Sequence, residues 1–166
     1  DFTNISSVET LSGAGTTGLL GNLGALASTA GITTVTFADT GASDNLTIDA
    51  EFANDLTVNL TNSGTDIDTL DASAFTKVLT VKGTATFMEA ANHVITGGTG
   101  TTDEIVVTAV NSSTGIDLAS MTGLTAFEKL TIANDKANGA IILDNLTVAD
   151  GATFTIDATA QTSSTS

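Results

Sequence analysis

Short runs of alternating apolar and polar residues recur along most of the chain. In each run an apolar residue is followed by Thr, Asn, Asp or Lys with a period of two. This alternation is typical of a β-strand that buries one face and exposes the other to water. The pattern predicts strands at 32–37, 45–49, 55–60, 77–82, 104–110, 128–133, 145–150 and 152–158. The sequence therefore predicts an all-β protein built from many short strands.

Several of these runs are near-copies of one another. FTNISSVETL (2–11) matches MTGLTAFEKL (121–130) place by place, so that Val8-Glu9 corresponds to Phe127-Glu128, and AFTKVLTV (74–81) is a looser copy. TGASDNLTID (40–49) is similarly matched by TGTTDEIVVT about sixty positions later. These copies predict one unit that occurs roughly twice, at a spacing of about 50 to 60 residues.

A repeated unit of this kind cannot bury its apolar face alone, whereas stacked copies can. We therefore expect an irregular parallel β-solenoid, in which inward Leu, Ile, Val and Phe form a continuous core and polar turns follow the edges. The alternative is a β-sandwich, which also consists of short alternating strands. The direct repeats, the scarcity of hairpin dipeptides and the lack of Trp and Tyr favour the solenoid. Residues 1–166 are expected to form a single domain of a longer extracellular chain.

One stretch departs from the strand pattern. In residues 17–31 the apolar side chains fall on one helical face, and Gly31 stands where a helix C-cap would. The members of that face are Leu19, Leu20, Leu23, Leu26, Ala27 and Ala30. The pattern predicts a short helix that covers the open edge of the first coil, with a glycine-rich loop as the alternative.

The charge balance restricts the partners. The chain carries 19 acidic residues against 4 basic ones, all lysines, for a formal net charge of -15. Such a charge repels phosphate backbones and anionic lipids, so nucleic acid is disfavoured as a partner and cations are favoured. No segment approaches the roughly 20 apolar residues of a transmembrane helix, so no membrane insertion is expected. There is no Cys to form disulfides or thiolate metal sites.

Acidic residues cluster at the predicted turns, often just after a glycine. Equivalent turns of successive coils lie about 4.8 Å apart, so stacked carboxylates repel one another unless a cation neutralises them. Calcium suits such turns because it accepts carboxylate and backbone oxygens in loose geometry. The predicted metal ligands are Asp44, Asp66, Asp68, Asp103 and Asp117, together with Gly41, Gly64 and Gly100. The alternative for any one Asp is a plain turn residue that binds its own backbone.

Two of these stretches resemble a known repeat family. GGTGTTDEIVV (97–107) and SGTDIDTLDAS (63–73) resemble degenerate copies of the RTX repeat, GGxGxDxUx. The resemblance implies a calcium-binding parallel β-roll of the kind found in bacterial surface-layer and large exported proteins. The match is imperfect, because Thr102 holds the Asp place of the first copy and Asp66 a glycine place of the second.

The motifs of common enzyme classes are missing. There is no GxSxG elbow, HExxH helix or Walker loop, and His93 has no evident partner along the sequence, which is typical of a surface or core histidine. Solenoid lyases and sugar-binding grooves use Arg, Trp or Tyr, none of which occurs here. We therefore expect no enzyme, and a carbohydrate-active enzyme is a distant alternative. Ice binding needs Thr-x-Thr ranks in register, and along the sequence these appear out of register.

The sequence thus favours a structural module of an extracellular bacterial assembly at the cell surface, a surface layer or filament, that calcium stabilises or assembles. Its expected partners are further copies of itself, with a cell-surface polysaccharide as a second candidate. The alternative function is a spacer or ligand-binding module of a large exported adhesin. If Asp44 and Asp103 are calcium ligands, Asp44→Asn and Asp103→Asn lower the melting temperature in calcium but not in EDTA.

Overall fold

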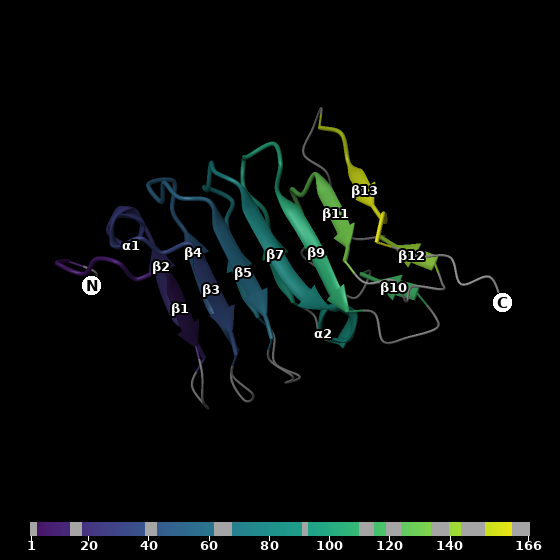
Figure 1. Cartoon of the computed structure of the whole chain (residues 1–166), viewed down its shortest axis with the longest axis horizontal. Helices are drawn as coiled ribbons and strands as arrows, with labels where there is room; N and C mark the ends of the chain where they lie inside the picture. Colours follow the sequence, from purple (N-terminus) through teal and green to yellow (C-terminus); the bar gives the residue numbers. More distant parts are fainter. Residues whose placement is uncertain are drawn as a thin grey trace.

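The chain winds into a flattened coil of parallel strands (Figure 1). The structure is a computed structural model and describes residues 3–13, 18–38, 43–61, 68–90, 93–109, 115–118, 124–133, 140–143 and 152–160. The odd-numbered strands form one sheet in the order β1-β3-β5-β7-β9-β11-β13, and β2-β4-β6-β8 form a second. Every pairing between these strands is parallel. The predicted β-solenoid is therefore confirmed.

The strand boundaries show how each coil contributes to both sheets. The first sheet comprises β1 (Thr10–Gly13), β3 (Thr34–Phe37), β5 (Leu56–Leu60), β7 (Leu79–Thr84), β9 (Glu104–Ala109), β11 (Lys129–Ile132) and β13 (Thr155–Asp157). The second comprises β2 (Leu20–Leu23), β4 (Asn45–Ile48), β6 (Thr69–Asp71) and β8 (Val94–Thr96). A separate pair joins β10 (Gly115–Asp117) to β12 (Ala140–Ile142). Each of the first four coils passes along the seven-stranded sheet, turns, and returns along the four-stranded sheet.

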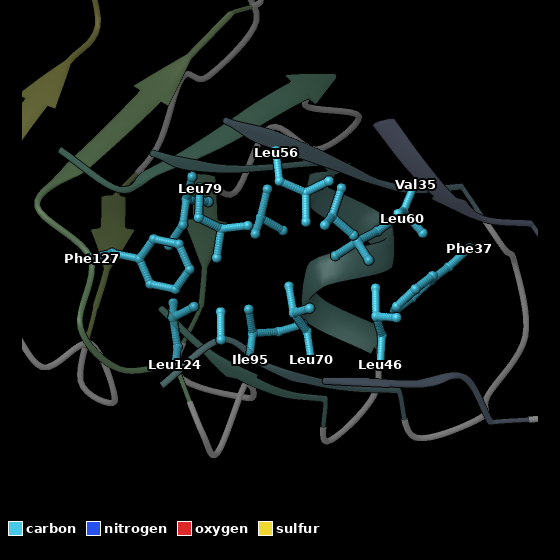
Figure 2. Packing of buried hydrophobic residues seen from close by; sticks show 14 of the residues in the cluster. Val35, Phe37, Leu46, Leu56, Leu60, Leu70, Leu79, Ile95, Leu124 and Phe127 are labelled. Carbon is cyan, nitrogen blue, oxygen red and sulfur yellow. The ribbon is translucent and has the colours of Figure 1, made fainter. Parts of the chain in front are cut away.

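Alternation along the strands places the core between the two sheets. Val35, Val58 and Val81 are in register on β3, β5 and β7 and are all at most 1% exposed. Leu46 and Leu70 line up on the opposite sheet, and Figure 2 shows the two layers of side chains facing each other. A fully buried aliphatic side chain contributes roughly 1.5–3 kcal/mol. The stacked apolar columns therefore hold the coils together.

The repeat is shorter than the sequence predicted. Thr34 pairs with Thr57 and Thr57 with Thr80, so one coil takes 23 residues there. Glu104 pairs with Lys129, so a later coil takes 25. The predicted spacing of about 50 to 60 residues was wrong. A coil contains two similar strands, one in each sheet, so a match between two segments does not show whether they belong to the same sheet.

The match between residues 2–11 and 121–130 is nevertheless real. Continuous register places Leu11 on β1 and Leu130 on β11 in one core column of the seven-stranded sheet. Glu9 and Glu128 stand just ahead of the same two strands. The two segments are therefore equivalent parts of distant coils.

Both helices lie in corners of the coil. The predicted helix over 17–31 is reduced to α1 (Ala25–Ala30), because Leu20–Leu23 form β2, while Gly31 does adopt the expected left-handed C-cap with φ of 99°. The backbone N–H of Val8 donates to Ala30 O, and Asn54 Nδ2 donates to Ser28 O. α1 thus lies between neighbouring turns and does not cover the edge of β1. The second helix, α2 (Ala85–Ala90), joins β7 to β8 and was not predicted.

The predicted strand at 145–150 lies outside the described residues, and the predicted ranges do not include β1, β2, β6, β8, β10 and β12. Threonines prove to be more regular than the sequence suggested. Thr10, Thr34, Thr57 and Thr80 lie in register on the outer face of the seven-stranded sheet. The next outward row is mixed, holding Ser12, Thr36, Asn59 and Lys82. Both rows are thus in register across these four strands, but only the first consists of threonine throughout.

Candidate functional site

The first group of buried polar side chains lies just ahead of the strands of the second sheet. Register places Leu19, Asp44, Asp68 and His93 in one column, ahead of β2, β4, β6 and β8. Asp44 and Asp68 are 0% exposed and His93 is 1% exposed. This column brings together two predicted metal ligands and the histidine that the sequence left unassigned.

Each polar member of this column accepts a hydrogen bond from the coil before it. Asp44 Oδ1 accepts the backbone N–H of Leu19. Asp68 Oδ1 accepts the N–H of Asp44 at 3.0 Å, and His93 Nδ1 accepts the N–H of Asp68 at 3.1 Å. We call these four residues the first acceptor column. It links consecutive coils by side chain to backbone bonds in addition to the strand pairing.

A second acceptor column lies at the strand starts of the seven-stranded sheet. It consists of Leu79, the first residue of β7, and of Asp103 and Glu128, which stand just ahead of β9 and β11. Asp103 Oδ1 accepts the N–H of Leu79 at 2.9 Å, and its Oδ2 accepts the N–H of Gly98 at 2.6 Å. Glu128 Oε2 accepts the N–H of Asp103 at 2.8 Å. Asp103 is 0% exposed and Glu128 5% exposed.

The physical reason for both columns is the cost of an unpaired backbone donor. A buried N–H without a partner costs about 1–3 kcal/mol, and a bond to a charged acceptor is roughly twice as strong as a neutral one. The backbone N–H at the start of a strand points toward the next coil. At that level the next coil is still in its turn and has not yet begun its strand. A short acidic side chain at that point satisfies the donor, which answers why Asp recurs between a turn and a strand.

Burial has an electrostatic consequence in the second column. It raises the pKa of Asp103, and the N–H groups of Leu79 and Gly98 partly oppose this shift. Burial also raises the pKa of Glu128, with the N–H of Asp103 opposing and the neighbouring charge of Asp103 adding to the shift. Glu128 Oε1 is buried and accepts no hydrogen bond. The ionised form of this column is therefore held at some cost to the fold.

His93 is held in an apolar corner beside α2. Its ring stacks on Phe87 with centroids 4.4 Å apart and planes 19° apart. Burial lowers the pKa of His93, and the Asp68 carboxylate, 3.5 Å from Nδ1, opposes the shift. Because Nδ1 accepts the Asp68 N–H, we assign the ring proton to Nε2 in a neutral imidazole. Protonation of Nδ1 would remove the acceptor from the first column.

The glycine turn ahead of Asp103 is explained by close packing on the previous coil. A Cβ on Gly98 would lie 2.5 Å from Phe75 O, and one on Gly100 would lie 2.9 Å from Lys77 O. The turn also presents the Gly98 N–H to Asp103. Glycine is needed here so that two turns can stack at this distance.

The structure separates the two Asp residues that the sequence paired. Asp44 precedes a strand of the second sheet and Asp103 one of the first, so they stand in different columns and share only their local role. Asp117 lies exposed in β10. Gly41, Gly64 and Asp66 lie outside the described residues.

Asp44, Asp68 and Asp103 are the predicted calcium ligands that lie in the acceptor columns. Both oxygens of Asp103 accept backbone N–H bonds, and Asp44 and Asp68 are fully buried. Within the described ranges no three acidic or histidine side chains gather into a group that could hold a metal ion. These three Asp residues are therefore described as hydrogen-bond acceptors.

Sequence reasoning missed Glu128 and His93 as members of the columns. The available signal was the offset of 24 or 25 residues that links Asp44 to Asp68, Asp68 to His93, and Asp103 to Glu128. That offset is one coil. It was hidden because Asp, Glu and His share an acceptor role without sharing a residue type.

A polar hollow of about 660 Å³ lies at one end of the outer face of the seven-stranded sheet. Its lining includes Ser28, Asn54, Asp55, Thr57 and Thr80. Hydroxyl, amide and carboxylate groups suit a polar ligand. Its lining contains no residue of the acceptor columns. A second hollow, of about 490 Å³, is lined in part by Gly98, Gly100 and Glu128 of the second column.

Comparisons with protein-family models, with curated proteins and with solved structures give no match. Neither of the two described helices, each of six residues, could cross a membrane.

Proposed function

We propose that the chain is a structural module of an extracellular bacterial assembly, a surface layer or filament at the cell surface. The observation that carries this proposal is the unbroken parallel ladder from β1 to β13, reinforced in its interior by the two acceptor columns. Polar groups inside the fold are committed to joining one coil to the next. This use of buried charge suits a protein whose task is to keep its shape.

We propose that calcium acts as a counterion between copies of the chain. Each copy carries a formal charge of -15, and copies of one sign repel at low ionic strength. A divalent cation that bridges exposed carboxylates of neighbouring copies would reduce that repulsion. Exposed acidic side chains such as Glu9 and Glu51 are available for such bridges. In this proposal calcium is not bound in the buried columns.

The test is assembly of the purified chain. Millimolar CaCl2 should produce sheets or fibres, detected by light scattering and by negative-stain microscopy, and EDTA should reverse them. NaCl at matched ionic strength and MgCl2 are the controls that separate bridging from simple screening. A chain that stays monomeric under all of these conditions would contradict the proposal.

The second candidate is a spacer or ligand-binding module of a large exported adhesin, and the polar hollow beside Asn54 and Thr57 favours it. An uncharged polysaccharide from the cell surface is the ligand class that such a lining would bind. Titration of a monomeric sample with surface polysaccharide, followed by calorimetry, tests this candidate. Binding that is lost in Thr57→Leu but kept in Thr47→Leu, on the opposite sheet, would support it.

A further inference from the structure

The second hollow, of about 490 Å³, lies along the side of the coil stack. Its lining comes from Ser73, the segment 96–101, Ala126, Glu128 and Ala152. These residues belong to the turns that lead into four neighbouring strands of one sheet, β7, β9, β11 and β13. Its volume is within the range of small-ligand pockets, about 300–1,000 Å³. The hollow is thus large enough for a small ligand that lies across successive turns.

Glu128 alone carries a charge among the described residues of this lining. Its side chain is 5% exposed, and its Oε2 accepts the N–H of Asp103 at 2.8 Å. Its Oε1 is buried and accepts no hydrogen bond. An ionised carboxylate can accept about four hydrogen bonds, and a buried polar atom without a partner costs free energy. A ligand that donates a hydrogen bond to Oε1 would remove that cost.

The charge of Glu128 has no cation beside it in the described part of the chain. None of the ion pairs between described side chains includes Glu128 or Asp103. Burial raises the pKa of Glu128, and the neighbouring charge of Asp103 adds to the shift. A positive charge at the hollow would offset both effects, since an opposite charge favours the ionised carboxylate. The side chain therefore favours a ligand that is both a cation and a hydrogen-bond donor.

The remaining walls of the hollow are small and uncharged. They include Ala126, Ala152 and the glycine turn 97–100. A Cβ on Gly97 would lie 2.1 Å from Ala126 O, so the neighbouring turns are packed too closely for a larger residue there. Calcium takes six to eight oxygen ligands, whereas the described lining contains a single carboxylate. An aliphatic stem that ends in an ammonium group suits these walls better than a metal ion does.

We propose that this hollow binds a primary alkylammonium group, with Glu128 as its counter-charge. The ammonium donates to Glu128 Oε1 while the Asp103 N–H keeps Oε2, and the aliphatic stem lies against Ala126 and Ala152. A free aliphatic amine and the lysine side chain of another copy both carry this chemistry. The formal charge of -15 raises the local concentration of either. The site does not depend on the proposed structural role.

Titration with n-butylammonium chloride tests the site, with NMR on a ¹³C- and ¹⁵N-labelled chain as the readout. The side-chain carboxyl signal of Glu128 should shift and then saturate as butylammonium is added. Tetramethylammonium chloride is the matched control, because it has the same charge but no N–H to donate, and it should leave the signal unchanged. An equal response to tetramethylammonium or NaCl would show charge screening only and would overturn the site. A response to CaCl2 without one to butylammonium would overturn it as well.

Two variants test the roles of the carboxylate and of the space beside it, with affinity measured from the amide signals of Gly97 and Gly98. Glu128→Gln keeps an oxygen for the Asp103 N–H but removes the charge, and should weaken butylammonium binding at least about ten-fold. Glu51→Gln, at an exposed site, is the control and should bind as wild type does. Ala152→Leu leaves Glu128 intact but fills part of the hollow from an exposed position, and should also weaken binding. Unchanged affinity in both Glu128→Gln and Ala152→Leu would overturn the site.

Protein concentration separates the two sources of the ammonium group. If a lysine of another copy enters the hollow, the Glu128 carboxyl signal should shift with protein concentration when no amine is added. A signal that is independent of concentration, yet responds to butylammonium, assigns the site to a free amine. Both results support the site, because each requires that an alkylammonium binds beside Glu128. Failure of butylammonium to bind would overturn the site and leave the structural role to its own test, assembly in calcium.

Discussion

Leu56 and Leu79 occupy the same place in adjacent coils, just at the start of β5 and β7, yet their backbone N–H groups find different partners. The N–H of Leu56 donates to Val78 O at 3.0 Å, whereas the N–H of Leu79 donates to the Asp103 carboxylate at 2.9 Å. In the other sheet, the same role is taken by Asp68 and His93. The need for an acceptor is constant, while carbonyl, carboxylate and imidazole are interchangeable ways to meet it.

This comparison explains how an acidic chain can bury carboxylates inside its fold. At Leu56 the coil above brings its own carbonyl close, so no side chain is required. At Leu79 the acceptor is instead the Asp103 carboxylate of the next coil, which accepts both the Leu79 and the Gly98 N–H. Asp55 assists the simpler arrangement by accepting the N–H of Val78.

The largest expected effect comes from removing the double acceptor. Asp103→Ala leaves two buried N–H groups without partners, which should lower the free energy of unfolding by roughly 2–5 kcal/mol. Asp55→Ala, the matched control, removes one acceptor at an exposed site and should lower it by less than about 1 kcal/mol. Urea denaturation measures both. Equal losses in the two variants would contradict the distinction between the two strand starts.

The next effect concerns the turn that Asp103 serves. Gly98→Ala places a Cβ 2.5 Å from Phe75 O and should destabilise the fold by roughly 1–3 kcal/mol. Gly21→Ala is the control, because no atom lies within 4 Å of the added Cβ, and it should be neutral or slightly stabilising. Thermal unfolding compares them. A neutral Gly98→Ala would mean that the two turns are not stacked so closely.

A smaller expected effect distinguishes a hydrogen-bond acceptor role of Asp103 from calcium ligation by Asp103. Asp103→Asn keeps one oxygen acceptor but replaces the other with an amide donor, and should cost about 1–2 kcal/mol. Because both oxygens already bind backbone N–H groups, we expect the same loss of melting temperature in calcium and in EDTA. A loss confined to calcium would restore Asp103 as a metal ligand, as the sequence had suggested.

The smallest expected effect is the pH dependence of stability that His93 gives to the first acceptor column. Burial lowers the pKa of His93 below its ordinary value of 6.5, so the folded state favours the neutral ring. The contribution of His93 to stability is then complete above pH 6.5 and is lost as the pH falls below that value. His93→Asn keeps an oxygen acceptor without a titrating ring, so it should remove this part of the pH dependence.

The contribution of His93 has to be measured as the difference in free energy of unfolding between wild type and His93→Asn. Asp103 and Glu128 have raised pKa values, so their contribution is present below their ordinary pKa values and is lost as the pH rises through the folded values. This opposes the His93 response but is common to wild type and His93→Asn. Denaturation of both at several pH values between 5 and 8 isolates the His93 contribution. A constant difference across that range would show that His93 does not titrate with folding.

Much of the fold could be predicted because its cause is local. Alternation in 32–37 and 55–60 places Val35 and Val58 inward in any sheet. Seven of the eight predicted strands overlap strands of the seven-stranded or four-stranded sheets. The strand β2 was mistaken for helix because Leu20 and Leu23 fit a helical face and stacking on β4 decides the matter. Long-range pairing of this kind is not encoded within a short window.

The acceptor columns could be predicted only in part. Asp44, Asp68 and Asp103 were singled out by their position after turns, but whether such a carboxylate points outward to a cation or inward to an N–H depends on register. Strand register cannot be read from the sequence alone, and the apparent repeat pairs Asp44 with Asp103 although they precede strands of different sheets. His93 and Glu128 became members of the columns only when the coil length was known.

The most direct test of the acceptor columns is a scalar coupling across the hydrogen bond between the Leu79 amide nitrogen and the Asp103 side-chain carboxyl carbon. It can be measured by NMR on a chain labelled with ¹⁵N and ¹³C. The bond length of 2.9 Å predicts an observable coupling that is unchanged when calcium is replaced by EDTA. A missing coupling, together with an Asp103 carboxyl signal that shifts on calcium addition, would contradict the account.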